Sequence, residues 1–359
     1  MNDEIFEHLA QALDRLPNGF PRTPSNVEIP MLQKIFSKEE AELASYLTGT
    51  METAAVIAER IGLEEGIVHK RLIALTKRGF VWLSKKDRKL RFRLAPFIVG
   101  IFEAFLEDMD HEFAHLYEEY MADGGAKGLM IPQPALHRVI PAHGAVKSEH
   151  VLPYDDVRAM LEACISFRVR DCICRVQQDL MGDRKCDFPV KMCVNFSPVE
   201  RPIHPNTISK EEALEILDKA EEVGLVHTVS NIAKDIYYVC NCCGCCCGIL
   251  RGITDWGIEG SVAYANYYAK IDTDECTGCG TCIERCQVNA IQEQDEVAVV
   301  QRERCIGCGL CVTGCTVGAV QLVKKPDAEI VHPPADFAAW EKERLRNRGL
   351  SNKEQSDVS

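Results

Sequence analysis

The sequence has no cysteine before Cys164, although the whole chain contains nineteen. It also lacks long apolar runs: residues 97–102 form one of the longest, far below the roughly 18 residues that suggest a membrane span. The first residues are acidic and helically periodic, without the basic and apolar segments of a signal peptide. We therefore expect a cytoplasmic protein with no membrane span, in which thiols remain reduced or bind metal.

Nucleotide-binding glycine motifs are also missing. No glycine-rich fingerprint follows a strand and opens a helix, and no phosphate-binding G-x-x-x-x-G-K-[ST] loop occurs, so flavin or nicotinamide binding is not indicated. The 41 basic and 54 acidic side chains give a formal charge of −13. This charge argues against general affinity for nucleic acids or anionic membranes.

The cysteine-free region, residues 1–125, has the pattern of a helical domain. Ser37 and Glu40 have the spacing of a capping box and open one helix; two more are expected near 54–61 and 64–78. Alternating residues at 80–83 and 90–94 predict two short strands joined by a turn. This order resembles a winged helix-turn-helix. A further helix, from Ile98 to about Tyr120, is expected to serve packing or a homodimer interface.

The resemblance implies that residues 84–93 are the wing and that the helix at 64–78 stands in the recognition position. Six basic side chains in the wing favour contact with phosphates. Glu64 and Glu65, at the start of the recognition helix, oppose it because phosphates repel carboxylates. DNA thus remains a possible partner, and the alternative is a docking or dimerisation platform. The basic residues are Lys85, Lys86, Arg88, Lys89, Arg91 and Arg93.

The middle region, residues 126–265, is predicted to be a cysteine-rich α+β domain. Adjacent cysteines on an extended chain point to opposite sides, so one ion cannot collect all the thiols of this region. The favoured hypothesis is at least one additional [4Fe–4S] cluster, built from Cys172, Cys174, Cys186 and Cys193 with part of the 240–247 run. The alternatives are a structural zinc site and buried unligated thiols. The candidate metal ligands are Cys172, Cys174, Cys186, Cys193, Cys240, Cys242, Cys243, Cys245, Cys246 and Cys247.

Three residues of the middle region are not assigned as ligands. Cys164 lies on an apparently amphipathic helix with Leu161 and Ile165, which favours a place in the core. His204 and His227 are lone histidines near apolar residues, a pattern more typical of structural histidines.

The region 266–325 contains an internal repeat, because residues 276–291 align with 305–320 at an offset of 29. Both halves read C-x₂-C-x₂-C-x₃-C, which places three thiolates on one tight loop and a fourth after it. Zinc sites supply four cysteines as two pairs instead, so zinc knuckles are disfavoured. The cysteines are Cys276, Cys279, Cys282 and Cys286, followed by Cys305, Cys308, Cys311 and Cys315.

This segment resembles the bacterial two-cluster ferredoxins. The resemblance implies two [4Fe–4S] clusters, with the fourth cysteine of each run serving the other cluster. Gln287 and Thr316 stand where the family has proline. The implied ligand sets are Cys276, Cys279, Cys282 and Cys315 for one cluster, and Cys305, Cys308, Cys311 and Cys286 for the second.

We thus predict an α+β multidomain chain: a winged-helix-like domain (1–125), a cysteine-rich centre (126–265), a two-cluster ferredoxin domain (266–325) and a C-terminal tail (326–359). This order resembles multidomain iron–sulfur proteins of anaerobes. The predicted function is single-electron transfer with redox protein partners, such as an oxidoreductase subunit or a ferredoxin, rather than stand-alone catalysis. The alternatives are a redox-responsive transcription regulator and a central cluster that itself catalyses a two-electron reduction.

Overall fold

The computed structural model describes residues 2–146, 151–152 and 154–350. They form two compact units: residues 2–133 with 341–350, and residues 134–340 apart from the gaps. Within these described ranges, none of the helices has the length and apolar character needed to cross a membrane. The predicted fraying at the end of the C-terminal tail falls on residues 351–359, outside the described residues.

The first unit is mainly helical. Its expected capping box is present, because Ser37 Oγ accepts a hydrogen bond from the backbone N–H of Glu40 and the Glu40 side chain accepts one from the N–H of Ser37. Three helices and an antiparallel hairpin, α3 to β2, follow in the order expected for a winged helix. The elements are α1 (Asn2–Asp14), α2 (Glu28–Ile35), α3 (Lys38–Ser45), α4 (Ala54–Ile61), α5 (Glu65–Lys77), β1 (Val81–Lys86), β2 (Lys89–Leu94), α6 (Phe102–Ala104), α7 (His111–Tyr120) and α8 (Ala126–Met130).

The prediction of a single helix from Ile98 to Tyr120 is wrong. Residues 98–100 have non-helical backbone angles, and a new helix begins after Asp110, whose side chain accepts a hydrogen bond from the N–H of Phe113. The apolar face of α7 is buried within its own unit, where Tyr117 stacks on Phe102 at 4.0 Å between ring centroids. This face is therefore not an exposed dimerisation surface.

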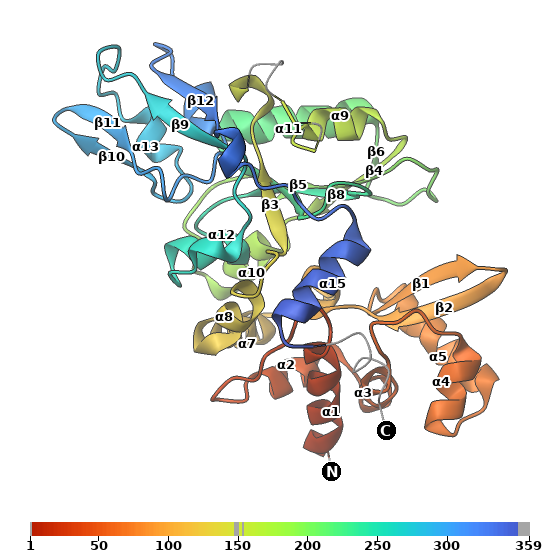
Figure 1. Ribbon diagram of the computed structural model, residues 1–359. Helices are drawn as coiled ribbons and strands as arrows, with labels where there is room; N and C mark the ends of the chain where they lie inside the picture. Colours follow the sequence, from red (N-terminus) through yellow and green to blue (C-terminus); the bar gives the residue numbers. More distant parts are fainter. Residues whose placement is uncertain (1, 147–150, 153, 351–359) are drawn as a thin grey trace. The chain divides into compact units, whose positions relative to one another are not determined.

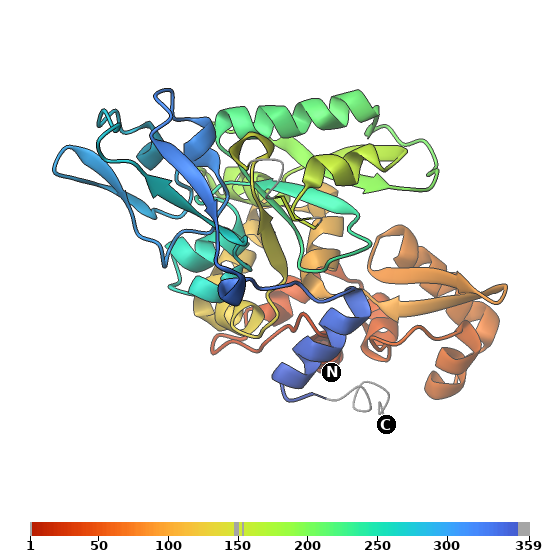
Figure 2. The same ribbon diagram turned by 45° about the horizontal axis from the view of Figure 1, so that its top comes forward.

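The second unit is built on a six-stranded antiparallel sheet of order β3-β7-β8-β5-β4-β6 (Figure 1). Helices α9 (Val157–Glu162) and α11 (Lys210–Val223) lie side by side over one face of the sheet (Figure 2). Leu161 and Leu217 from these helices pack with Val194 and Val239 of the sheet in one buried cluster. The strands are β3 (His137–Ile140), β4 (Ser166–Asp171), β5 (Lys191–Ser197), β6 (Thr207–Ile208), β7 (Val226–Ser230) and β8 (Tyr238–Cys242).

Both capping signals predicted for α11 are present. Ser209 and Glu212 form the reciprocal capping box, and Gly224 ends the helix in the left-handed conformation with φ of 92°. The chain then turns directly into β7. This places the end of α11 next to the cysteine-rich strand β8, because β7 and β8 pair.

The C-terminal part of the second unit consists of two short two-stranded sheets and two one-turn helices. Strand β9 pairs with β12, and β10 pairs with β11, all antiparallel. Each helix follows the first two cysteines of a run and carries the third, so the internal repeat of the sequence reappears in the structure. The elements are β9 (Tyr267–Ile271), α13 (Thr281–Glu284), β10 (Ile291–Gln294), β11 (Val297–Val300), α14 (Leu310–Thr313) and β12 (Val320–Lys324); α10 (Ile173–Met181) and α12 (Gly248–Thr254) precede them, and α15 (Phe337–Asn347) follows.

Candidate metal centres

The second half of the C-terminal repeat forms an apolar pocket lined by four thiols. Ala269, Ile291 and Leu310 also line it, together with the cysteines. The four thiols belong to the set implied for one cluster, in which the fourth cysteine of the first run joins three from the second. They are Cys286, Cys305, Cys308 and Cys311.

Backbone amides of this pocket already donate to sulfur. The N–H of Ala290 lies 3.1 Å from Cys286 Sγ, and the N–H of Ala269 lies 3.4 Å from Cys305 Sγ. Burial raises the pKa of the Cys308 thiol to about 12. A thiolate in this pocket therefore needs a bound cation to replace its proton. An apolar pocket with four thiols and amide donors fits an iron–sulfur cluster.

The other implied set lies closer to the surface. Cys282 is buried and Cys276 is half-buried, whereas Cys279 is exposed. A hydrogen bond from the backbone N–H of Thr281 and contact with its hydroxyl lower the pKa of the Cys279 thiol.

Four central thiols form a compact group, which we call the four-thiol group: Cys186, Cys243, Cys245 and Cys246. Their sulfur atoms all lie within 4.8 Å of one another, with Sγ–Sγ distances of 3.6 Å for Cys186–Cys246, 3.7 Å for Cys245–Cys246 and 3.9 Å for Cys186–Cys243. A tetrahedron of thiolates with a metal–sulfur distance of about 2.3 Å has edges of about 3.8 Å. The spacing therefore fits a single tetrahedral ion, whereas a cubane holds its thiolates on four different irons and hence farther apart.

In the absence of a cation, the thiols of the four-thiol group do not all ionise together. Contacts with Cys245 and Cys246 lower the pKa of the Cys243 thiol to about 2, while contact with Cys243 raises that of Cys245 to about 12. The first thiolate thus makes ionisation of its neighbours unfavourable. Four thiolates can coexist at this site only when a metal ion compensates their charge.

The remaining six central thiols contact one another in a closed sequence, which we call the six-thiol ring. Cys172 contacts Cys174 and Cys193; Cys240 contacts Cys193 and Cys242; and Cys247 contacts Cys242 and Cys174. They come from the start of α10, from β5, from β8 and from the residue before α12. The sequence grouping of Cys172, Cys174, Cys186 and Cys193 is therefore divided, since Cys186 lies in the four-thiol group.

Two of the adjacent cysteine pairs divide between the two groups. Cys242 belongs to the six-thiol ring and Cys243 to the four-thiol group, and Cys246 and Cys247 divide in the opposite order, whereas the adjacent Cys245 and Cys246 both belong to the four-thiol group. One short segment, residues 240–247, thus contributes thiols to both groups.

A buried arginine lies beside both groups. The Arg175 side chain is fully buried, and its guanidinium donates to the backbone carbonyls of Pro189 at 3.0 Å and Asn241 at 2.8 Å. Burial by itself lowers the pKa of Arg175, but the nearby thiolates, Cys172 foremost and Cys243 next, raise it overall. Arg175 thus supplies a fixed positive charge beside the cysteines. Sequence reasoning missed this role, although Arg175 directly follows Cys172-Ile173-Cys174.

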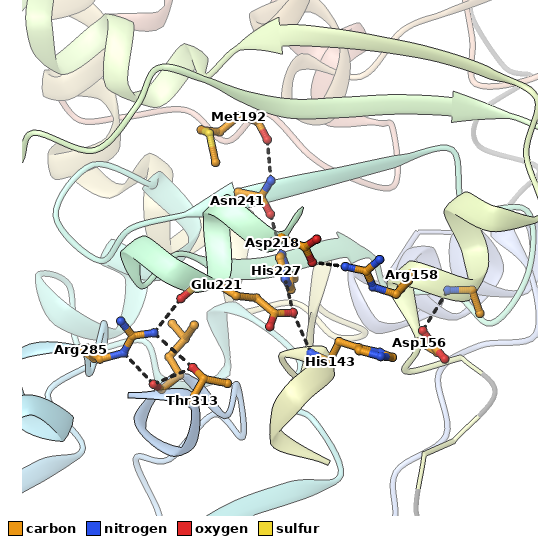
Figure 3. A network of polar contacts seen from close by, with 12 residues as sticks. His143, Asp156, Arg158, Met192, Asp218, Glu221, His227, Asn241, Arg285 and Thr313 are labelled. Atoms are coloured by element: carbon orange, nitrogen blue, oxygen red, sulfur yellow. Dashed lines mark hydrogen bonds and ion pairs between the residues drawn. The ribbon is translucent and has the colours of Figure 1, made fainter. Parts of the chain in front are cut away.

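Asn241 fixes the strand that carries two cysteines of the six-thiol ring. Its side-chain amide donates to the carbonyl of Met192 at 2.6 Å, and its Oδ1 lies 2.6 Å from His227 Nδ1 (Figure 3). His227 Nε2 lies 3.3 Å from Glu221 Oε1. His227 therefore holds Asn241 in position.

The same network reaches the C-terminal domain. Arg285 donates to the backbone carbonyl of Glu221 at 2.6 Å and to Thr313 Oγ1 at 3.2 Å (Figure 3). It also donates to the backbone carbonyl of Glu222 at 2.9 Å. Burial would raise the pKa of Glu221, but its hydrogen bonds with His227 and with the N–H of His143 hold it below the ordinary value. Arg285, which precedes Cys286, thereby fastens the loop that carries Cys286 to the end of α11.

A second contact joins the two cysteine-rich regions directly. The N–H of Gly244 donates to Gln287 Oε1 at 2.8 Å, and the Gln287 side-chain amide donates to the carbonyl of Gly224 at 2.9 Å. Gly244 lies between Cys243 and Cys245, and Gln287 follows Cys286. The departure from the family proline at this position thus has a structural role.

The two other unassigned residues are placed away from the thiol groups. Cys164 is 5% exposed in the apolar cluster beneath α9 and α11, as expected for a core residue. His204 is exposed and its Nδ1 accepts a hydrogen bond from the N–H of Asn206.

Comparison with known protein families identifies a similar segment near the C-terminus. Residues 269–322 match the family model described as a 4Fe-4S dicluster domain. No curated protein and no solved structure matches the chain. The matched segment contains all eight cysteines of the internal repeat. The prediction of an iron–sulfur, ferredoxin-like segment is thereby confirmed for residues 269–322, which are similar to the 4Fe-4S dicluster domain.

Proposed function

We propose that this protein relays single electrons between a redox protein partner and a metal centre formed by its central cysteines. The observation that carries the proposal is the hydrogen bond between Gly244 and Gln287, which brings the loop of Cys286 against the loop of Cys243 and Cys245. A [4Fe–4S] cluster, when bound, accepts and releases one electron. The match to a dicluster domain supports two such clusters.

The ligand sets follow from the resemblance and from the pocket. Cys305, Cys308, Cys311 and Cys286 would hold the inner cluster, because all four line one apolar pocket. Cys276, Cys279, Cys282 and Cys315 would hold the outer one, with Cys279 exposed. In this arrangement the outer thiols face a partner, and the inner thiols adjoin the central cysteines.

The chain's own side chains fix this geometry. Arg285 ties the C-terminal domain to α11, and Gln287 ties it to Gly224 and Gly244. Hydrogen bonds of these kinds hold the two regions in one arrangement, so electron transfer does not await a docking step. We further propose that the four-thiol group binds one tetrahedral metal ion that fixes the loop carrying Gly244.

Rapid mixing of the anaerobically prepared full-length chain with a reduced low-potential ferredoxin tests the relay. We expect reduction of the C-terminal clusters, followed by reduction of a second chromophore in the central region. The matched control is the Cys308→Ala variant, which should lose the inner cluster and the second phase together. Clusters that no carrier reduces or reoxidises would contradict the proposal.

A redox-responsive regulator is the second candidate, because the hairpin of the first unit exposes a basic tip. Lys85, Lys86, Arg88 and Lys89 are exposed there. Arg93 is engaged elsewhere, in an ion pair with Glu341 at 2.9 Å and over the Trp82 ring. Glu64 and Glu65 at the start of α5 are exposed and oppose DNA approach.

A gel-shift assay with the DNA upstream of the coding sequence, in reduced and oxidised states, separates the two candidates. If the protein only relays electrons, we expect no salt-sensitive binding of the chain to this DNA. Salt-sensitive binding that changes with oxidation, and is lost in a Lys85→Glu, Lys89→Glu variant, would favour the regulator.

A further inference from the structure

We infer that the six-thiol ring binds one polynuclear iron–sulfur cluster larger than a cubane, separate from the ion of the four-thiol group. This inference deepens the proposed function and rests on it for the use of iron–sulfur chemistry by this chain. The ring consists of Cys172, Cys174, Cys193, Cys240, Cys242 and Cys247.

The contact pattern excludes a single ion at the six-thiol ring. Thiolates that share one tetrahedral ion are all mutual neighbours, about 3.8 Å apart. Among the residues that the structure describes, the sulfur atoms meet this condition in the four-thiol group but in no three members of the six-thiol ring. Each ring thiol contacts two others in sequence around the circuit, so the six surround a space instead of converging on a point.

A binuclear zinc–thiolate site is excluded by the same argument. Each zinc ion in such a site has four thiolates around it, and these form mutually close groups of three or more. Among the described residues, no three sulfur atoms of the ring lie mutually within 4.8 Å. A core that contains several irons with inorganic sulfide between them has its thiolate ligands around its outside, as the thiols of the ring are arranged.

The six-thiol ring has more thiols than a [4Fe–4S] cubane binds. A [4Fe–4S] cluster takes four thiolates, one on each iron. Six thiols form the ring, and none is set apart as a spare, since each has two thiol neighbours within the circuit. A single core that uses all six, with one thiolate on each iron as in a cubane, holds more than four irons.

The surroundings provide what an anionic cluster needs. Cys172, Cys242 and Cys247 are 4–6% exposed, and the ring lies at the junction of α10, β5, β8 and α12. The buried Arg175 compensates negative charge, and its Nε is a buried donor without a partner in the described protein. An inorganic sulfide or a cysteine thiolate is an acceptor that would satisfy such a donor.

The test is metal and sulfide analysis with Mössbauer spectroscopy on the full-length chain, produced and purified without oxygen. The two C-terminal clusters contribute about eight irons. A ring cluster larger than a cubane predicts a total of more than about twelve irons besides any single iron of the four-thiol group, with acid-labile sulfide in proportion. A total of about twelve or fewer on the same count overturns the inference.

Two double variants assign the excess iron. Cys193→Ala with Cys240→Ala should remove more than four irons and leave the C-terminal cubane signal and the single ion intact. Cys245→Ala with Cys246→Ala should remove one metal ion only and leave the ring iron. Loss of four or fewer irons, or of zinc, from the first variant overturns the inference.

The outcome also separates this inference from the proposed function. A chain that keeps about eight reducible C-terminal irons but holds no excess iron contradicts the six-thiol cluster and leaves the relay through the dicluster domain standing. A chain without C-terminal iron contradicts the proposed function itself. If the ring variant does not fold, the wild-type iron total alone decides.

Discussion

Replacement of Gly244 by alanine tests the junction between the C-terminal and central cysteines. A Cβ added at Gly244 would overlap the carbonyl oxygen of Gln287 and would lie 2.9 Å from its carbonyl carbon. Carbon atoms in contact are about 3.5–4.0 Å apart, so the two loops must separate by about 0.6–1.1 Å or more. The obstacle is backbone, which cannot swing away as a flexible side chain can.

We expect two consequences of Gly244→Ala. Overpacking of a close contact lowers the free energy of unfolding by about 1–3 kcal/mol. The hydrogen bond from the N–H of Gly244 to Gln287 Oε1 is also lost, so electron transfer from the C-terminal clusters to the central centre slows while the iron content of the C-terminal domain stays unchanged. Freeze-quench EPR after rapid reduction measures the transfer, and denaturant unfolding measures stability.

Gly144→Ala is the matched control, because a Cβ there would lie 3.7 Å from Thr313 Cγ2, an ordinary contact in the same unit. It should leave both the transfer rate and the unfolding midpoint near their wild-type values. A Gly244→Ala chain that unfolds and transfers electrons like the wild type would refute the claim that this contact joins the two centres.

Further predictions concern a ligand, a hydrogen bond, a core thiol and a buried histidine. Cys308→Ala should halve the C-terminal iron from about eight to about four, read by iron analysis and Mössbauer spectroscopy; unchanged iron would contradict the ligand assignment. Gln287→Leu removes the bonds to Gly244 and Gly224, so transfer should slow at unchanged iron content, and an unaltered rate in freeze-quench EPR would argue against it. Cys164→Ser should leave the metal content unchanged and lower the unfolding midpoint, since a hydroxyl would replace a buried thiol in an apolar cluster. Burial lowers the pKa of His137 to about 4 in the folded chain, below its ordinary value of 6.5, so the unfolded state binds more protons as pH falls from 6.5 towards 4 and stability declines in that window. The loss between pH 7.5 and 5.5 is about 1 kcal/mol, measurable by urea unfolding, and His137→Gln should remove that part of the pH dependence.

Local signals in the sequence predicted much of the fold because they act through neighbouring residues. The capping boxes at Ser37 and Ser209 and the end of α11 at Gly224 depend on hydrogen bonds within one turn, and the structure has them. The helix expected from Ile98 to Tyr120 is broken, because Asp110 caps a new helix and the backbone near Gly100 is extended. Apolar periodicity alone does not reveal such a break.

For the candidate site, too, the sequence predicted the features that depend on neighbouring residues but not those that depend on long-range packing. The spacing in the C-terminal repeat was informative, since three thiols on one loop must lie close together, and the family match confirms its iron–sulfur character. The central cysteines were different, because their grouping depends on how β5, β8 and α10 pack. Nothing local places Cys186 with Cys243 while Cys193 joins Cys240, and nothing local places Gln287 against Gly244.

The most direct test of the electron relay is freeze-quench Mössbauer spectroscopy of the ⁵⁷Fe-labelled full-length chain, made without oxygen and mixed with a reduced low-potential ferredoxin. The account predicts that about eight irons with cubane parameters are reduced first and are then reoxidised as a separate central iron signal becomes reduced. A chain whose C-terminal cysteines hold zinc or are paired as disulfides, or whose reduced cubanes never pass an electron to the central iron, would contradict it.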